Sequence, residues 1–247
     1  MRKAIGVLFV TAALAVLGAS VASADVVTGT RSASTFTSDD SLHWGLLGVN
    51  NFFVANGATL STNSGIGTTV TFGTGGTGAT LEQCPAGSCT WTGNFAPGDE
   101  LLTDINFNTG GDSGRIVLSF ATGISGIGFQ LEPNLAGVTF ATEIAVYDGS
   151  TLLGTFYFPF GTEKLHAEDN SAGFYGVNDL SGANITSIQV LAYNCGGVGV
   201  NCEGFAINQA KIEDVASTAT PEPASLALLG SGLGLLGFLR RKRTASK

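Results

Sequence analysis

Three side chains of the types used in nucleophilic catalysis occur in order along the chain. They are His43, Asp104 and Ser113, the last within the string Gly-Asp-Ser-Gly at residues 111–114. In a catalytic triad the histidine takes the proton of the serine hydroxyl, and the carboxylate orients the imidazole. If the fold brought these three residues together, they would predict hydrolysis of an ester or an amide.

The residues around this set favour a plainer interpretation. The string GDSG resembles the neighbourhood of the nucleophile in trypsin-like serine proteases, but His43 lacks the small-residue and cysteine neighbours that the family uses. Asp104 precedes Ser113 by only nine residues, far closer than that fold places them. Asp, Ser and Gly are also standard turn residues. We therefore expect a turn here and predict no catalytic residue.

Acidic side chains are the second group that could support chemistry. Hard cations such as Ca²⁺ take oxygen ligands from carboxylates and backbone carbonyls, often in loops. The candidate ligands of a structural calcium ion are Asp99, Glu100, Asp104, Asp112, Glu168 and Asp169. No stretch matches an EF-hand loop or a nonapeptide calcium repeat, so we expect these acids mainly to keep an exported surface soluble. We predict no cofactor, and the sequence identifies no metal.

The four cysteines form two local pairs, Cys84 with Cys89 and Cys195 with Cys202. An even number of cysteines in an exported chain usually forms disulfides. Four cysteines allow three connectivities, and we favour the two local pairings because short, glycine-rich loops close easily. The alternative is a structural zinc site, but neither spacing is C-x-x-C and no histidine lies near either pair.

Aromatic side chains offer a third kind of site, one for carbohydrate. Sugar sites on β-sandwiches commonly place aromatic faces beside Asn, Asp and Gln side chains. The aromatic candidates are Trp44, Trp91, Tyr147, Tyr157, Phe174, Tyr175 and Tyr193. Most of the sixteen phenylalanines must belong to the core, and one sequence does not separate exposed rings from buried ones.

The elements that must position these residues are short β-strands. Several runs alternate apolar and polar residues, so that each offers one apolar face to a core. The runs are residues 114–120, 126–131, 142–147, 151–158, 185–192 and 205–212. Asp148-Gly149-Ser150 between two of them predicts a hairpin, because Asp and Gly tolerate a positive φ. With no convincing helix in the body, this pattern predicts an all-β fold, an antiparallel jelly-roll-like β-sandwich.

The N-terminal segment, residues 1–24, has the three parts of a secretory signal peptide. Two cations precede an apolar run, and the segment ends in Ala22-Ser23-Ala24. The pattern predicts export through the Sec machinery and cleavage between Ala24 and Asp25. The alternative, a membrane anchor, is disfavoured because the run is short for a spanning helix.

The body between residues 25 and 219 is strongly acidic. It holds four cations and eighteen carboxylates, which gives a net charge of −14. Phosphate contacts need clustered Lys and Arg, so this charge argues against nucleic acid as a partner. About 195 residues suffice for one domain with a real core.

The C-terminal segment, residues 220–247, combines three features. Pro221-Glu222-Pro223 precedes an apolar run over residues 224–239, and Arg240-Arg241-Lys242-Arg243 follows it. Sixteen residues rise about 24 Å as a helix, slightly short for a bilayer but workable with snorkelling arginines. The four cations resist translocation, so they are expected to act as a cytoplasmic stop that leaves the body outside.

This arrangement resembles the PEP-CTERM protein-sorting segment of Gram-negative bacteria, which is also known as an ice-binding protein C-terminal domain. The resemblance implies that an exosortase, a membrane transpeptidase-like enzyme, recognises Pro221, Glu222 and Pro223 as substrate residues, and that the helix is then removed. It also implies a transient inner-membrane precursor and a final place in the cell envelope, on the outer surface or outside the cell. The alternative is a plain C-terminal anchor.

The body itself resembles, more loosely, the jelly-roll β-sandwich modules that are often attached to such tails. The likeness lies in the order GIGFQL, EIAVYDGSTLLGTF, GFYGV, ITSIQV and GFAIN, over roughly residues 114–213. In many of those modules the last motif carries Asp where this chain has Asn208, so no ligand role is transferred to this position. We predict one extracellular domain over residues 25–219.

The leading functional hypothesis is a non-enzymatic structural or carbohydrate-associating component of exopolysaccharide or biofilm. Its expected partners are the exosortase, the Sec machinery and extracellular polysaccharide. The alternative is a glycan-active hydrolase with two carboxyl groups about 5–10 Å apart in an aromatic-lined cleft. A third hypothesis is ice or surface binding by Thr-rich strands such as residues 67–72, but the irregular Thr spacing argues against it.

Overall fold

The computed structural model describes most of the predicted body. The described residues are 26–49, 52–72, 81–85, 95–96, 98–104, 114–133, 139–162, 172–196, 202 and 204–214. The predicted signal peptide with its cleavage site at Ala24 and Asp25 lies outside these ranges, as does the whole predicted sorting segment. None of the helices within the described ranges has the length and apolar character needed to cross a membrane.

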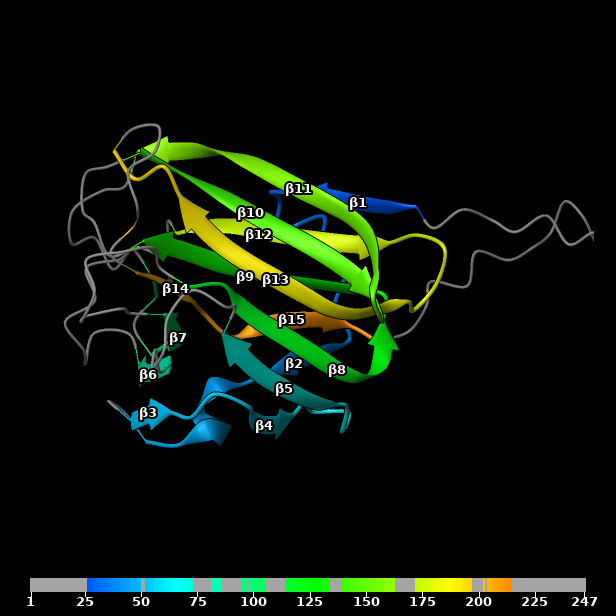
Figure 1. Ribbon diagram of the computed structural model, residues 1–247, viewed down its shortest axis with the longest axis horizontal. Coiled ribbons are helices and arrows are strands. Elements are labelled where there is room, and N and C mark those ends of the chain that lie inside the picture. The colour runs from blue at the N-terminus through cyan, green and yellow to red at the C-terminus, as the bar shows by residue number, and fades with distance from the viewer. Residues whose placement is uncertain are drawn as a thin grey trace, which may run out of the picture.

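The described chain folds into two antiparallel sheets that pack face to face, which confirms the prediction of an all-β sandwich (Figure 1). The larger sheet contains nine strands, in the order β1-β12-β9-β14-β7-β6-β3, with β15 beside β9 and β2 beside β15. These strands are β1 (Val27–Thr30), β2 (Asp40–Leu42), β3 (Phe52–Val54), β6 (Leu81–Pro85), β7 (Glu100–Asp104), β9 (Gly126–Pro133), β12 (Gly173–Asp179), β14 (Phe205–Ile207) and β15 (Ala210–Glu213).

The smaller sheet has six strands, in the order β11-β10-β13-β8-β5-β4. They are β4 (Ala58–Ser61), β5 (Gly67–Phe72), β8 (Ile116–Ile124), β10 (Thr139–Asp148), β11 (Thr151–Thr162) and β13 (Ile185–Tyr193). A 3-10 turn, η1 (Trp44–Leu47), follows β2. The predicted hairpin is present, because β10 pairs with β11 across the turn and Gly149 there has a φ of 55°.

The core lies between the two sheets and is built from the inward residues of each strand. In β8 the buried positions alternate with half-buried ones, as the sequence predicts, and the same holds for β13. Ile127, Phe129 and Leu131 of β9 face this core from the larger sheet. Each fully buried side chain of this size contributes about 1.5–3 kcal/mol. Hydrophobic burial between the sheets therefore holds the fold together.

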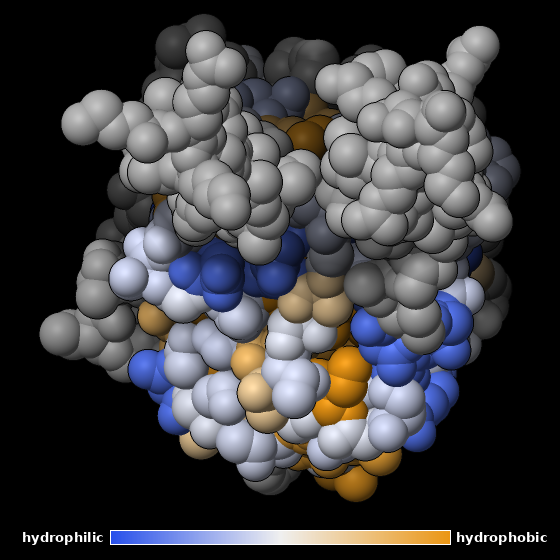
Figure 2. All heavy atoms as spheres, turned by 90° about the vertical axis from the view of Figure 1, so that its right-hand side faces the viewer, coloured by the Kyte–Doolittle hydropathy of each residue, from blue (hydrophilic) through white to orange (hydrophobic). Residues whose placement is uncertain are grey.

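The first described strand, β1, begins at the end of the sandwich where the last one, β15, finishes. Leu180 donates a backbone hydrogen bond to Val26, the residue before β1, and Ser125 donates one to Glu213 at the end of β15. This is the right-hand end in Figure 1, and Figure 2 views it directly. Where its residues are described, the surface there is mostly polar with small separate apolar patches.

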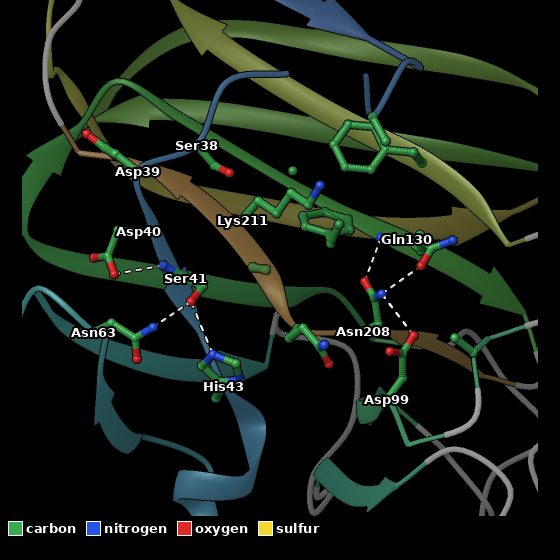
Figure 3. Close-up of a pocket in the computed structure, with 17 residues that line it drawn as sticks. Ser38, Asp39, Asp40, Ser41, His43, Asn63, Asp99, Gln130, Asn208 and Lys211 are labelled. Atoms are coloured by element: carbon green, nitrogen blue, oxygen red, sulfur yellow. Dashed lines mark hydrogen bonds between the residues drawn. The ribbon is translucent and has the colours of Figure 1, made fainter. Parts of the chain in front are cut away.

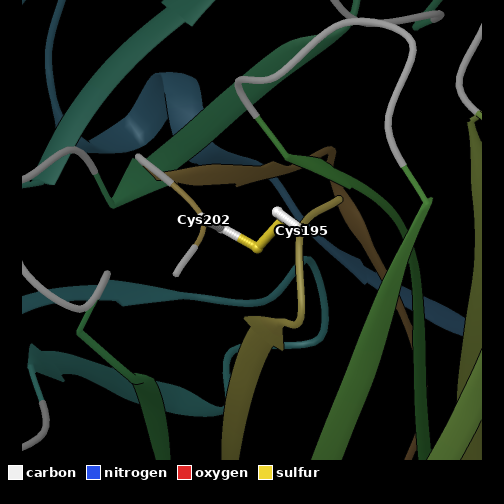
Figure 4. The surroundings of a disulfide bond; sticks show 2 residues. All are labelled: Cys195 and Cys202. Carbon is white, nitrogen blue, oxygen red and sulfur yellow. A yellow bond between two sulfur atoms is a disulfide. The ribbon is translucent and has the colours of Figure 1, made fainter. Parts of the chain in front are cut away.

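The disulfide between Cys195 and Cys202 is present, as the short spacing predicts (Figure 4). It joins the residues after β13 to those before β14, with a Cα–Cα distance of 5.1 Å. Both cysteines are buried and belong to the main hydrophobic core. Cys84 lies in β6, and its predicted partner Cys89 is outside the described residues.

One predicted strand is wrong in a way that matters for the site. Residues 205–212 form two strands, β14 and β15, rather than one. Ile207 pairs with Leu131 and Lys211 pairs with Gly128, so four residue steps on this side oppose three on β9. One extra residue at Asn208-Gln209 makes a β-bulge-like break, and such a break re-aims side chains.

Candidate functional site

The principal candidate site is a hollow of about 600 Å³ on the outer face of the nine-stranded sheet (Figure 3). Alternation along β9 places it there, because Phe129 and Leu131 face the core while Gly128 and Gln130 line the hollow. The bulge adds both Asn208 and Gln209 to the same lining. The volume lies within the range of roughly 300–1,000 Å³ typical of small-molecule sites. We refer to this hollow as the outer pocket.

Phe174 of β12 provides the aromatic part of the outer pocket. Its ring lies close over Gly128, where a Cβ atom would collide with it, so glycine is needed for this close approach. Phe36 contacts the ring with centroids 5.6 Å apart, and the Lys211 ammonium lies 6.0 Å from the ring centroid. The ring is thereby fixed against the sheet.

Asn208 holds one side of the outer pocket together. Its side-chain nitrogen donates to Gln130 Oε1 at 2.7 Å and to Asp99 Oδ2 at 3.1 Å, while its side-chain oxygen accepts from Gln130 N at 2.8 Å. Its backbone carbonyl accepts from Trp44 Nε1 at 2.8 Å. Both amide hydrogens are used, so Asn208 acts as a clamp between elements and not as a ligand contact.

The same bonds explain why the residue is Asn. Asp99 and Gln130 both present acceptor oxygens to it, and only an amide nitrogen can donate to two acceptors at once. An Asp at this position would set a second carboxylate against Asp99. The departure from the Asp found in similar modules therefore fits the surroundings of Asn208.

Asp40 anchors the opposite wall. Its Oδ1 accepts from Ser41 N at 2.7 Å and from Ser64 N at 3.1 Å, and its Oδ2 accepts from Ser64 Oγ at 2.6 Å. Burial acts to raise the pKa of Asp40, but hydrogen bonds from Ser64, Thr62 and the backbone outweigh it and hold the pKa below its ordinary value. This carboxylate is therefore ionised and already used by the fold.

A polar chain continues from Asp40 toward the interior of the pocket. Asn63 Nδ2 donates to Ser41 Oγ at 2.7 Å, and Ser41 Oγ is hydrogen-bonded to His43 Nε2 at 3.1 Å. His43 thus interacts with a different serine from the one considered in the sequence. These three side chains present hydroxyl, amide and imidazole groups of the kind that bind sugar hydroxyls.

Asp104, the last residue of β7, is a buried carboxyl group. It is fully buried, and neither of its carboxylate oxygens has a hydrogen-bond partner among the residues that the structure describes. Burial raises the pKa of Asp104 to about 7. It does not line the outer pocket, where His43 lies, and Ser113 is outside the described residues. The described residues thus bring no triad together.

The predicted calcium ligands do not converge either. Asp99 accepts from Asn208, Glu100 Oε2 accepts from Gly45 N at 2.6 Å, and Asp104 is buried with no hydrogen bond to its carboxylate from any described residue. Asp112, Glu168 and Asp169 lie outside the described residues. Over the described ranges, no group of three or more His, Cys, Asp or Glu side chains could hold a metal ion.

The aromatic candidates for sugar binding separate into three groups. Trp44 and Tyr175 are buried, which leaves them unsuited to contact a sugar: the Trp44 indole donates to the Asn208 carbonyl, and Tyr175 packs edge-on against Phe158. Phe174 lines the outer pocket. The register places three others on the outer face of the six-stranded sheet, namely Tyr147, Tyr157 and Tyr193. Trp91 lies outside the described residues.

Sequence reasoning missed Gln130, Gln209 and Lys211 as pocket residues. All three sit within or beside runs that read as simple alternating strands, and their convergence depends on the bulge at Asn208-Gln209. The available signal was the polar pair Asn208-Gln209 inside an otherwise apolar-alternating run.

The similarity of the body to the solved structures reported below is weak. No curated protein matches the chain. A solved structure of a DUF4465 family protein from Bacteroides caccae is 12% identical with a TM-score of 0.39, covering 76% of this chain and 99% of that one. The enzymatically active domain of tailspike protein 4 from bacteriophage CBA120 is 14% identical with a TM-score of 0.28, covering 58% of this chain and 19% of that one.

The C-terminal segment, by contrast, has a clear match. Residues 219–243 match the family model described as the PEP-CTERM protein-sorting motif. The matched range contains the Pro-Glu-Pro tripeptide, the apolar run and the basic cluster. This chain therefore carries a PEP-CTERM protein-sorting motif, which implies export and processing by an exosortase-type system.

Proposed function

We propose that this protein is an exported component of the cell surface or extracellular matrix that associates with polysaccharide through the outer pocket. The sorting motif supports the proposed location, since it implies delivery of the body to the outside of the cell. The body then meets the polysaccharide there. We further propose that it acts as a binding or structural component rather than as an enzyme.

The observation that carries the proposal is the chemistry of the outer pocket. Amide, hydroxyl and imidazole groups from β2, β9 and the bulge converge on one hollow beside the Phe174 ring. A sugar offers many hydroxyl groups and weakly apolar C–H faces, so a polar pocket with one aromatic wall matches it. The clamp of Asn208 and the Asp40 network hold these groups in place before any ligand arrives, which lowers the cost of binding.

The carboxylates favour binding over hydrolysis. Glycoside hydrolysis needs an acid of raised pKa and a second carboxylate at least about 5 Å away. Asp40 in the pocket has a lowered pKa, and Asp104, with its raised pKa, does not line the pocket. A hydrogen bond to the Asp39 side chain raises the pKa of Asp214, but these two carboxyl groups are in contact and leave no room for a sugar between them.

The test fills the outer pocket without removing a polar group. Ala33 is exposed at the pocket wall, so Ala33→Trp adds bulk there. Ala55 is also exposed but lies outside the pocket, which makes Ala55→Trp a matched control. We expect the wild type and the control to co-sediment with the extracellular polysaccharide of the producing cells, and Ala33→Trp to lose about tenfold or more in affinity. Equal binding by both variants would reject the pocket as the sugar site.

A further inference from the structure

We propose that the outer pocket selects sugars that carry a carboxylate, and that Lys211 is the residue that confers this selectivity. The inference rests on the proposed function, because it assumes that the outer pocket binds sugar. It goes beyond that function by naming the ligand class, an acidic polysaccharide, and the specificity-determining residue.

Lys211 lies among the residues that line the outer pocket. On β15 it pairs with Ser41 on one side and Gly128 on the other, so two walls of the pocket flank it. Figure 3 shows its side chain in the middle of the labelled residues, between Ser38 and Asn208. Its ammonium contacts the Phe174 ring and makes no hydrogen bond or ion pair with any residue that the structure describes.

The carboxylates around the pocket, by contrast, already have protein partners. Asp40 accepts three hydrogen bonds from Ser41 and Ser64, and Asp99 accepts one from Asn208. Asp39 accepts one from the backbone of Asp214 at 2.9 Å. The cation is therefore the charged group in this pocket whose donors are left for a ligand.

The neutral groups beside Lys211 also have donors to spare. The Gln209 side-chain oxygen accepts from Glu100 N at 3.2 Å, which leaves both hydrogens of its amide nitrogen without a partner in the described structure. The Ser38 hydroxyl is likewise not engaged by any described residue, and it points toward the Lys211 side chain. Spare donors around one cation suit a ligand rich in acceptor oxygens, and a sugar carboxylate supplies two on one carbon.

The acidic body does not prevent such binding at physiological ionic strength. A net charge of −14 repels a polyanion at long range, but charges more than about 8 Å apart are largely screened in roughly 0.15 M salt. A carboxylate in contact with the Lys211 ammonium lies well within that distance. The local pairing therefore dominates, and low salt weakens the binding because the body then repels the polymer over a longer range.

The probe is an oligogalacturonide, compared with the same oligosaccharide after chemical reduction of its carboxyl groups. The two share ring geometry and linkage, so they differ in charge and carboxylate oxygens. Titration calorimetry on the exported protein in 0.15 M salt measures both affinities. We expect the wild type to bind the acidic form about tenfold or more tightly than the reduced form.

Two variants assign the preference to Lys211. We expect Lys211→Gln to lose the preference by weakening binding of the acidic form to the level of the reduced form, and Lys211→Arg to retain most of it. Arg115→Gln is the charge-matched control, because it removes one cation from the Glu143 ion pair outside the pocket. It should bind both forms like the wild type.

Equal affinity of the wild type for both forms, no binding of either form, or wild-type behaviour of Lys211→Gln would overturn the inference. These results leave the proposed function standing as long as Ala33→Trp still loses the polysaccharide of the producing cells. If Ala33→Trp binds that polysaccharide like the wild type, the proposed function fails, whatever Lys211 does.

Discussion

Three hydrogen bonds join Asn208 to Gln130. The Asn208 side chain accepts from the Gln130 backbone and donates to the Gln130 side chain, and the Asn208 backbone nitrogen donates to the Gln130 carbonyl at 3.1 Å. These bonds tie the bulge between β14 and β15 to the middle of β9. They keep the outer pocket open at the one place where the alternation of the strand breaks.

Asn208→Asp should therefore destabilise the fold. The change removes both donors and places a carboxylate against Asp99, so we expect a loss of about 2 kcal/mol or more in the free energy of unfolding at pH 7. Urea denaturation measures it. The control Asn63→Asp changes an exposed Asn whose side chain donates one hydrogen bond, to Ser41, and should cost under about 1 kcal/mol. Similar losses of unfolding free energy in the two variants would contradict this role of Asn208.

Asp104 should make stability depend on pH. Its folded pKa is raised to about 7 from an ordinary 3.8, so the folded state binds a proton that the unfolded state releases. The resulting stabilisation is full below about pH 4 and disappears as the pH rises through 7. Asp104→Asn removes this dependence and should be more stable than the wild type at pH 8, by up to a few kcal/mol. Melting temperatures at pH 5 and pH 8 measure it, and parallel pH profiles would refute it.

Gly128→Ala should disturb the outer pocket through Phe174. The added Cβ meets the ring, which must move, so we expect about 1–3 kcal/mol of destabilisation and weaker polysaccharide binding. Gly67→Ala in β5 is the control, because a Cβ there makes only an ordinary contact with Ala121. Equal polysaccharide affinity and equal stability of the two variants would contradict this role of Gly128.

The Cys195–Cys202 disulfide should contribute stability through a short loop. Its sequence separation of 7 corresponds to roughly 2–3 kcal/mol in the chain-entropy model. The double variant Cys195→Ser, Cys202→Ser should lose at least this amount, because both side chains are buried. Denaturant unfolding of the variant, with the wild type in reducing and non-reducing buffer, measures the loss. A double variant as stable as the oxidised wild type would exclude this role.

The sorting motif should govern release. Pro221→Ala with Pro223→Ala alters the predicted recognition residues inside the matched range, so we expect an unprocessed, membrane-retained precursor. Mass spectrometry of the membrane and extracellular fractions distinguishes the precursor from the processed form. Replacement of Thr244 and Ser246, which lie beyond the matched range, is the control and should leave processing intact. Normal release of the double-proline variant would reject recognition by an exosortase.

The sandwich was predictable because alternation and turn chemistry are local. Asp148-Gly149 predicts its hairpin from two residues, and the run at 185–192 gives β13 almost to the residue. The outer pocket was not predictable, because its residues come from segments far apart in the chain. Trp44 is the clearest example. Its ring is fully buried, and its indole nitrogen donates to the carbonyl of Asn208, which is distant in the sequence.

The most direct test of the account is to map where polysaccharide fragments contact the isotope-labelled protein by NMR chemical-shift perturbation. We predict that the shifts cluster at Ser38, Ser41, Gln209 and Lys211, which line the outer pocket. Shifts that cluster instead at Tyr157 and Tyr193 on the six-stranded sheet, or no shifts at saturating fragment, would contradict the central claim.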